Sequence, residues 1–289
     1  MPKTGGTTMG SILERCFPGD LHFNADVGEP DSSTWTLSRA KIAEKYNLLP
    51  AEAKQSFRAV IYGHVPMGIH ILFDRPAKYF TFVRHPVDRV VSQFYYMRTQ
   101  SYLPIFERIQ NMTLDQYLDS GLGLDPFDHQ VRMLSGCEEL DGPYGTDGKP
   151  VPAVPVEGRH LHLAKQNIET HFLAAAPFQE FAAVVILLKR LYGWRLRQCL
   201  FEVRRATERR PRVADLSAAT RRHIEDCNRH DMELYDWTKR RFADQIRALE
   251  PRISRDRRLF NIVNKSWQRA GHIMTGNLRA RITNLLLHM

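Results

Sequence analysis

Residues 79–99 read YFTFVRHPVDRVVSQFYYMRT and predict a strand, a turn and a helix in immediate succession. Tyr79–Val83 is a run of aromatic and β-branched residues, which is typical of a buried strand. Pro86 suits the first turn of a helix, and Asp88 complements the helix dipole. A strand that leads directly into a helix indicates an α/β fold. The apolar residues that follow recur at helical spacing and are expected to face the core: Val87, Val90, Val91, Phe94 and Met97.

Two polar residues of this unit are candidates for binding an anion. Arg84 stands at the carboxyl end of the strand, where α/β proteins bind ligands. Ser92 lies about two turns into the helix, at most ~10 Å along its axis. A guanidinium and a hydroxyl in this arrangement can hold one phosphate between them. For an isolated segment, the alternative is that Arg84 and Arg89 are solvated charges that flank the helix.

The first eight residues, MPKTGGTT, form a second candidate anion site, because a run compatible with a helix follows at Met9–Cys16. Backbone N–H groups at a helix N-terminus and the helix dipole both favour an anion. The two glycines let the backbone approach a ligand closely, the lysine adds a charge, and the threonine hydroxyls add donors. The pattern is not a Walker A loop, in which the lysine follows the glycines. An ordinary flexible N-terminus is the alternative for this loop taken alone. The candidate binding residues are Lys3, Thr4, Gly5, Gly6, Thr7 and Thr8.

A histidine between these two segments is the best candidate for a general base. His64 follows the apolar run Ala59–Tyr62, which predicts a strand that ends at a cleft. An imidazole titrates near neutral pH and can accept a proton from a hydroxyl. The alternative is a buried histidine bonded to the backbone, but its place between the two anion motifs favours the base. His70 and His85 are weaker candidates.

Together these segments resemble the sulfotransferases that use 3′-phosphoadenosine 5′-phosphosulfate (PAPS). The loop looks like their 5′-phosphosulfate-binding loop, and Arg84 with Ser92 looks like their 3′-phosphate site. Residues 62–65, Tyr-Gly-His-Val, resemble the segment that carries the catalytic base. The resemblance is to the carbohydrate group that includes heparan sulfate 2-O-sulfotransferase and its bacterial relatives. It covers most of residues 1–250, with a weaker match at residues 128–136, DHQVRMLSG.

The resemblance implies a fold, a reaction and a set of roles. The fold is an α/β, P-loop-like three-layer sandwich with a central parallel sheet flanked by helices. The reaction moves a sulfuryl group in line from PAPS to a hydroxyl, expected to belong to a saccharide, and needs no metal. In this reaction His64 acts as base and Lys3 stabilises the leaving phosphate. The loop residues from Lys3 to Thr8, with Arg84 and Ser92, bind PAPS.

Two features depart from the family pattern. In relatives a buried parallel strand runs directly into the phosphosulfate loop. This sequence begins at Met1, so we expect the first strand to be missing or truncated. Residues 176–181, APFQEF, are more apolar than the turn that relatives often carry there. The contacts of that turn therefore cannot be carried over to this chain.

Length and composition fit one substantial α/β domain with a basic end. The chain has 289 residues, of which 43% are hydrophobic and 25% are charged. We expect a sulfotransferase domain over residues 1–250 and a basic C-terminal extension over residues 251–289. The extension holds eight Lys or Arg and a single acid, Asp256, out of a net charge of +9. Such an extension attracts an acidic polysaccharide, nucleic acid or an anionic membrane, while a solvated extension without a partner is the alternative.

Cysteine usage and hydropathy give further expectations. The four cysteines are far apart and form no CxxC pair, which indicates reduced thiols. The sequence shows no cluster with metal-ligand spacing, no apolar run near the ~20 residues that span a bilayer, and no signal peptide. With the resemblance, this predicts a cytoplasmic enzyme of bacterial type, or one of the Golgi lumen if a missing N-terminus carried an anchor.

Three hypotheses about function remain in competition. The first is a PAPS-dependent sulfotransferase that acts on a saccharide, with an acidic polysaccharide among the candidate acceptors and no specific nucleic-acid partner. The second is a kinase-like P-loop enzyme, which requires a lysine after the glycines and an acid that holds magnesium. The third is a truncated, inactive relative that binds polyanions through its basic C-terminal tail.

The remaining sequence predicts several further elements. Residues 18–37 are rich in turn-forming residues and are expected to be irregular, and residues 141–158 predict a surface loop. A stripe of apolar residues on the last long helix is expected to face the core: Met232, Tyr235, Phe242, Ile246 and Leu249. The predicted helices are Ser38–Tyr46, Ala51–Phe57, Thr113–Ser120 with Thr113 as its cap, Glu180–Tyr192 and Ser217–Leu249, and a further strand is predicted at Phe172–Ala176.

Overall fold

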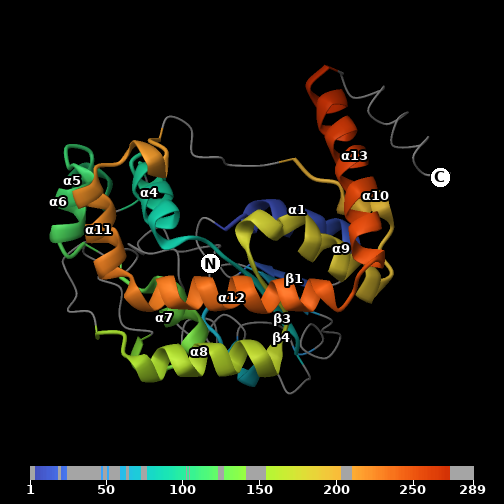
Figure 1. Ribbon diagram of the computed structural model, residues 1–289, viewed down its shortest axis with the longest axis horizontal. Coiled ribbons are helices and arrows are strands. Elements are labelled where there is room, and N and C mark those ends of the chain that lie inside the picture. The colour runs from blue at the N-terminus through green and yellow to red at the C-terminus, as the bar shows by residue number, and fades with distance from the viewer. Residues whose placement is uncertain are drawn as a thin grey trace.

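A computed structural model gives the structure of the chain (Figure 1). It describes residues 4–18, 21–24, 47, 51, 59–62, 65–72, 77–101, 103, 105–122, 127–140, 154–202 and 210–273. The described helices are α1 (Gly6–Cys16), α4 (Pro86–Met97), α5 (Phe106–Ile109), α6 (Leu114–Asp119), α7 (His129–Ser135), α8 (Gly158–His171), α9 (Phe181–Tyr192), α10 (Leu196–Cys199), α11 (Ala218–Cys227), α12 (Arg229–Arg247) and α13 (Arg252–Ile273). Short 3₁₀ helices occur at Ile69–Leu72, Glu138–Leu140, Phe178–Glu180 and Val213–Asp215.

The described strands form two parallel pairs. β1 (Leu21–Asn24) pairs with β2 (Ala59–Tyr62), and β3 (Tyr79–Val83) pairs with β4 (Phe172–Pro177). Parallel strands require crossover connections, and helices in such connections are the mark of α/β proteins. The predicted α/β class is therefore confirmed, although the described strands lie in two pairs rather than in one continuous sheet.

Helices cover both faces of the β3–β4 pair. Successive strand residues point to opposite faces, so neighbouring residues join different core clusters. Phe82 and Ala176 join a core cluster with α1 and α9 on one face. Val83 and Ala175 join a second cluster with α7 and α8 on the other face. Figure 1 shows α1 and α9 on one side of the strands and α8 on the other. The result is a layered arrangement of helix, strand and helix.

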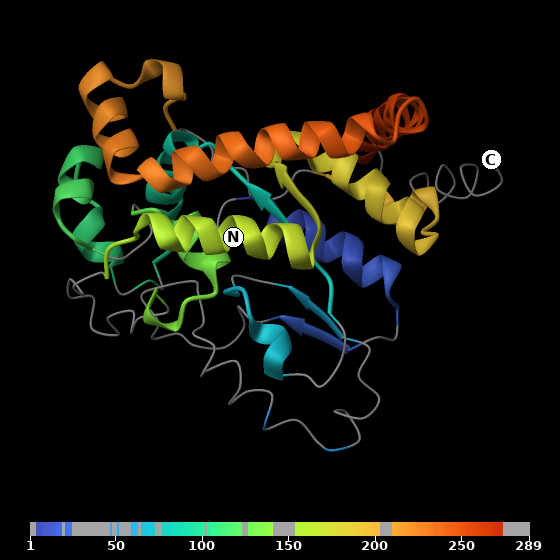
Figure 2. The same ribbon diagram turned by 60° about the horizontal axis from the view of Figure 1, so that its bottom comes forward.

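The long helix α12 links these two core clusters. Leu234 and Tyr235, near its start, pack in the cluster with α7 and α8. Phe242 and Ile246, two turns later, pack in the cluster with α1 and α9. Figure 2 shows α12 running across the molecule beside α8. A third cluster joins α4 to α5, α6 and α11 at the other end of the molecule.

Most of the strong sequence patterns are confirmed. The strands predicted at Ala59–Tyr62 and Tyr79–Val83 coincide with β2 and β3. All five apolar residues predicted to face the core from the helix after Pro86 are buried. Thr113 caps α6, since its side chain accepts the Gln116 N–H while the Gln116 side chain accepts the Thr113 N–H.

Some expectations were wrong. β1 lies within residues 18–37, which were predicted to be irregular. Its four residues are too few to show an alternating pattern in the sequence, and its strand conformation depends on pairing with β2. The helix predicted at Ser217–Leu249 is broken at Asn228 into α11 and α12. Leu249 is 40% exposed rather than part of the core. Helix α1 starts at Gly6, one turn earlier than predicted.

Other expectations lie outside the described residues. These are the whole helix predicted at 38–46, the helix predicted at 51–57 apart from its first residue, and residues 141–153 of the predicted loop.

The break at Asn228 allows α7 and α12 to cap one another. The Asp231 carboxylate accepts the N–H groups of Gln130 and Val131 at 3.0 and 2.8 Å, in the first turn of α7. Asp128, immediately before α7, accepts the Asp231 N–H at 2.8 Å and donates its own N–H to the Asn228 amide oxygen. Buried helix ends require such partners, so these side chains fix the two helices together.

This junction perturbs the titration of Asp128. Burial, reinforced by the neighbouring Asp231 carboxylate, raises the pKa of Asp128 to about 7. Burial also raises the pKa of Asp231, although the Arg89 guanidinium opposes that shift. Asp128 also adopts a left-handed backbone conformation, with φ of 43°, which asparagine tolerates well.

Asp128→Asn is expected to remove a pH-dependent loss of stability. The pKa of Asp128 is about 7 in the folded protein and near 3.8 in the unfolded chain. Its contribution to stability is therefore fully present below about pH 4 and is lost as the pH rises through 7. The native chain should lose about 2–3 kcal/mol in its free energy of unfolding between pH 5 and pH 8 through this group, and the variant should not. The stability of the variant relative to the native chain should therefore rise by that amount. Urea unfolding at both pH values measures this.

Asp226→Asn, at an exposed aspartate of α11, is the matched control and should leave that pH dependence unchanged. An equal gain in both variants would contradict the assignment to the buried junction.

Candidate functional site

The predicted loop residues Thr4–Thr8 lie at the start of α1. Gly5 precedes the helix with φ of +85°, and the Met9 N–H closes the first turn on the Gly5 carbonyl at 3.0 Å. The first N–H groups of an α-helix cannot pair within it, so they point out of its N-terminal end. The first turn of α1 carries no acidic residue. The positive end of the helix dipole is therefore not neutralised by the side chains of that turn.

Gly5 is in close contact with two aromatic rings. A Cβ atom on Gly5 would lie 2.7 Å from Cε2 of Phe178 and 3.2 Å from Cε2 of Phe181. Both rings follow the carboxyl end of β4, in the segment where the sequence departs from the family pattern. The backbone conformation and this close approach both require glycine at residue 5.

Arg84 contacts the same Phe178 ring. Its guanidinium carbon lies 5.5 Å from the ring centroid, which is a cation–π arrangement. One aromatic side chain therefore touches both of the predicted anion-binding segments, which are far apart in the sequence. The structure brings the start of α1 and the end of β3 together at this ring.

Gln130 fixes the backbone of Arg84. The Arg84 N–H donates to the Gln130 amide oxygen at 2.8 Å, and the Gln130 amide nitrogen donates to the Arg84 carbonyl at 3.0 Å. Gln130 is fully buried on α7. Its own N–H is one of the two held by Asp231. The end of β3 is thereby tied to the junction of α7 and α12.

Asp88 joins Arg84 to a second arginine. Its two carboxylate oxygens lie 2.7 Å from Nε of Arg84 and 2.7 Å from Nη1 of Arg210. Burial acts to raise the pKa of Asp88, but the two guanidinium groups outweigh it, and the pKa lies below its usual value. Burial lowers the pKa of Arg84, and Asp88 opposes that shift. Two cations that share one carboxylate leave an excess positive charge beside Phe178.

Ser92 lies on the same face of α4 as Asp88, one turn further along, because residues four apart in a helix are neighbours. Its side chain is buried, as are those of Arg84 and Arg89. The alternative that the two arginines are solvated flanking charges is therefore wrong. Arg84 and the loop at Gly5 meet at the ends of β3 and β4, and Ser92 lies about two turns into α4, the helix that follows Arg84.

Two of the predicted site residues, Lys3 and His64, lie outside the described residues. Of the two weaker histidine candidates, His70 is hydrogen-bonded through Nδ1 to the Tyr79 hydroxyl at 2.8 Å. Tyr79 is the first residue of β3, so His70 lies at the end of the strand opposite to Arg84. His85 follows Arg84 directly, and its ring packs edge-on against that of Tyr235.

The sequence interpretation missed three residues of this region: Phe178, Gln130 and Arg210. Phe178 lies in APFQEF, which stood out only as a departure from relatives. Gln130 lies in DHQVRMLSG, which resembled the family without an assigned role. Nothing in the sequence around Arg210 distinguished it from the other arginines, since its contact with Asp88 depends on the fold.

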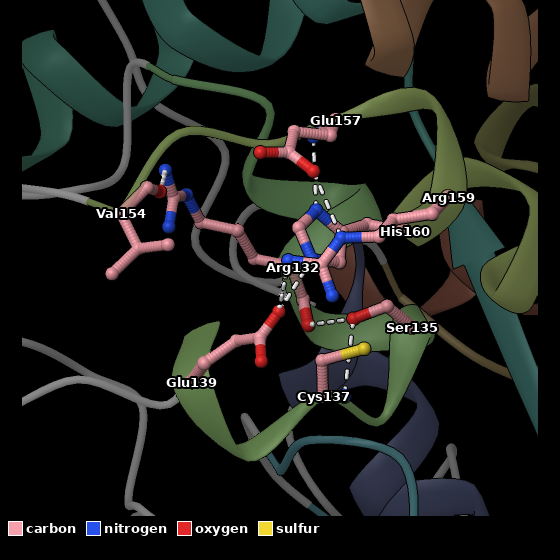
Figure 3. A network of polar contacts seen from close by, with 8 residues as sticks. All are labelled: Arg132, Ser135, Cys137, Glu139, Val154, Glu157, Arg159 and His160. Atoms are coloured by element: carbon pink, nitrogen blue, oxygen red, sulfur yellow. Dashed lines mark hydrogen bonds and ion pairs between the residues drawn. The ribbon is translucent and has the colours of Figure 1, made fainter.

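A separate polar group, formed by the segment after α7 and the start of α8, offers three atoms of the kinds that bind metals (Figure 3). Cys137, Glu139 and His160 each place one such atom within 4.8 Å of the others. However, Nδ1 of His160 accepts the Glu157 N–H at 2.9 Å, so the ring proton is on Nε2, which lies 2.8 Å from the Glu139 carboxylate. Metal-binding histidines show the opposite arrangement, with a proton on the nitrogen that faces away from the ion. We interpret the group as a hydrogen-bonded junction that holds α8 beside α7.

The fold and this region define a class of protein. It is an α/β protein in which the candidate anion-binding segments meet at the carboxyl ends of parallel strands and at a helix N-terminus, where such folds typically place ligand sites. Comparison with known families then gives the particular group. The sequence profile of the galactose-3-O-sulfotransferase family matches residues 2–266, and the chain belongs to this family.

The family match refines the resemblance seen in the sequence. It supports a carbohydrate sulfotransferase and not the specific resemblance to heparan sulfate 2-O-sulfotransferase. A search of curated proteins finds no significant match to the chain. None of the described helices combines the length and the apolar character needed to cross a bilayer.

Gly5→Ala is expected to destabilise the protein. The added Cβ meets the Phe178 ring and forces a side chain into a left-handed conformation, which should lower the free energy of unfolding by about 1–3 kcal/mol. Gly6→Ala is the matched control, because no atom lies within 4 Å of a Cβ at that residue. Gly6 is the first residue of α1, so alanine at this residue should leave the free energy of unfolding unchanged or raise it slightly. Chemical denaturation of the two variants tests this, and an equal loss in both would contradict the role of Phe178.

Proposed function

We propose that this chain transfers a sulfuryl group from PAPS to a hydroxyl group of a saccharide. Membership of the galactose-3-O-sulfotransferase family supports sulfuryl transfer to a saccharide hydroxyl. The family name favours a galactose residue as the acceptor and its 3-hydroxyl as the nucleophile. The observation that carries the proposal is the contact of one ring, Phe178, with both Gly5 and Arg84.

The described donors fit a ligand with two anionic groups. The N-terminus of α1, with no acid in its first turn, suits the 5′-phosphosulfate. Arg84 and Arg210, with the Ser92 hydroxyl on the neighbouring helix face, suit the 3′-phosphate. In this proposal Asp88 holds the two guanidinium groups in place before the ligand arrives, which reduces the ordering that binding requires.

Two residues outside the described part of the chain complete the proposed chemistry. His64 takes the proton of the acceptor hydroxyl as its oxygen forms a bond to sulfur. The bond between sulfur and the bridging oxygen of the 5′-phosphate breaks, and Lys3 neutralises the charge that develops on that oxygen. The α1 N–H groups keep the phosphosulfate in line with the acceptor. PAPS supplies the activated sulfuryl group.

His64→Ala is expected to abolish sulfate transfer while PAPS binding persists, because the substitution removes the proposed base and leaves the anion sites intact. Transfer from radiolabelled PAPS to a panel of glycans with and without terminal galactose measures activity. Calorimetric titration with adenosine 3′,5′-bisphosphate measures binding. Failure of the native chain to bind this nucleotide would refute the sulfotransferase proposal and favour an inactive, polyanion-binding relative.

Arg84→Ala and Arg210→Ala should each weaken binding of adenosine 3′,5′-bisphosphate by about 10- to 100-fold, since each removes a charge-assisted hydrogen bond. Arg212→Ala is the matched control. Arg212 is exposed and lies two residues from Arg210, so its removal should change binding little. If all three variants bound equally well, the two arginines would have no place in the nucleotide site.

A further inference from the structure

Helix α13 packs against the body of the protein with one face. Ile253 and Phe260 are 0% and 1% exposed and lie in the core cluster with α9, and Trp267 packs beside them. The Asn264 side chain accepts the Phe201 N–H at 2.8 Å. Figure 1 shows α13 at the edge of the molecule, beside α9 and α10. These contacts fix which side of α13 faces away from the protein.

The opposite face of α13 combines exposed apolar and basic side chains. Leu259 and Ile262 are 56% and 66% exposed and lie near the middle of this face. At 3.6 residues per turn, five exposed basic residues fall on the same side of the helix. We call these seven residues the outer face of α13: Arg252, Arg255, Arg258, Leu259, Ile262, Lys265 and Arg269.

Two acidic residues near α13 form ion pairs away from the outer face. Asp256 pairs with Arg190 of α9 at 2.7 Å. Glu180, at the start of α9, pairs with Arg257 at 2.9 Å. Both contacts lie on the side of α13 that meets α9. Within the described part of α13 the outer face is therefore uniformly basic around its two apolar residues.

We propose that the outer face of α13 binds an anionic membrane surface. Helices that lie in the plane of a membrane carry apolar residues for the acyl boundary and basic residues for the lipid headgroups. Arginine and lysine side chains are long enough to reach headgroup phosphates while the helix backbone rests at the interface. The outer face spans about 25 Å at 1.5 Å per residue, so several headgroups can contact it at once.

Two other occupants fit the outer face less well. A polysaccharide or nucleic acid would use the positive charges but would leave Leu259 and Ile262 exposed beside polar groups. A second copy of the chain would set two uniformly basic faces against each other, and like charges at close range repel. An anionic bilayer satisfies both the charges and the apolar pair.

Flotation of the full chain with lipid vesicles tests the proposal. The chain should bind phosphatidylcholine vesicles that contain about 30% phosphatidylserine, and it should not bind pure phosphatidylcholine vesicles. Leu259→Ser/Ile262→Ser should lower the vesicle partition coefficient about tenfold or more. A variant with Arg255, Arg258, Lys265 and Arg269 changed to Gln should lose binding to a similar or greater extent. Unchanged melting temperatures would show that the variants fold.

Lys239→Gln/Arg240→Gln, at exposed basic residues of α12, is the matched control and should bind as the native chain does. Full vesicle binding by Leu259→Ser/Ile262→Ser, with binding to heparin lost only in the charge variant, would overturn the proposal in favour of a polyanion site. Light scattering that showed a dimer dissociated by either outer-face variant would overturn it in favour of a protein interface. Equal binding to neutral and anionic vesicles would also overturn it.

Discussion

The hydrogen-bonded pair between Gln130 and the Arg84 backbone is the contact on which the arrangement of this region depends. The backbone N–H and C=O at the end of a buried strand must find partners, and here one fully buried amide side chain supplies both. Gln130 is fixed in turn by Asp231, which links it to α12. The direction in which Arg84 leaves β3 is thus set by the packing of two helices that lie far along the chain.

The second constraint is the crowding around Phe178. The ring lies against Gly5 and against the Arg84 guanidinium, so one side chain joins two segments that are far apart in the sequence. Phe178 lies in APFQEF, the segment that differs from the turn expected from the family resemblance. An apolar ring carries no charge that would compete with an anion at the proposed site.

Electrostatics in this region follows from an imbalance of charge. Asp88 is shared by Arg84 and Arg210, so the group keeps a net positive charge in partly buried surroundings. The buried junction of Asp128 and Asp231 instead brings two carboxylates close together, with Arg132 acting on the first and Arg89 on the second. Asp88 lies on α4, and Asp231 lies on α12, which contacts α4.

The sequence by itself determined the local elements with strong patterns. It predicted β2, β3, α4 and the Thr113 cap, because periodicity and capping depend on neighbours within a few residues. It also marked Gly5 and Arg84 as candidate anion-binding residues, because a glycine before a helix and an arginine at the end of a strand both suit an anion site. Only the tertiary structure decided that Phe178 joins these residues, that Arg210 shares Asp88, and that one face of α13 remains exposed. These depend on contacts between distant segments, which no local pattern encodes.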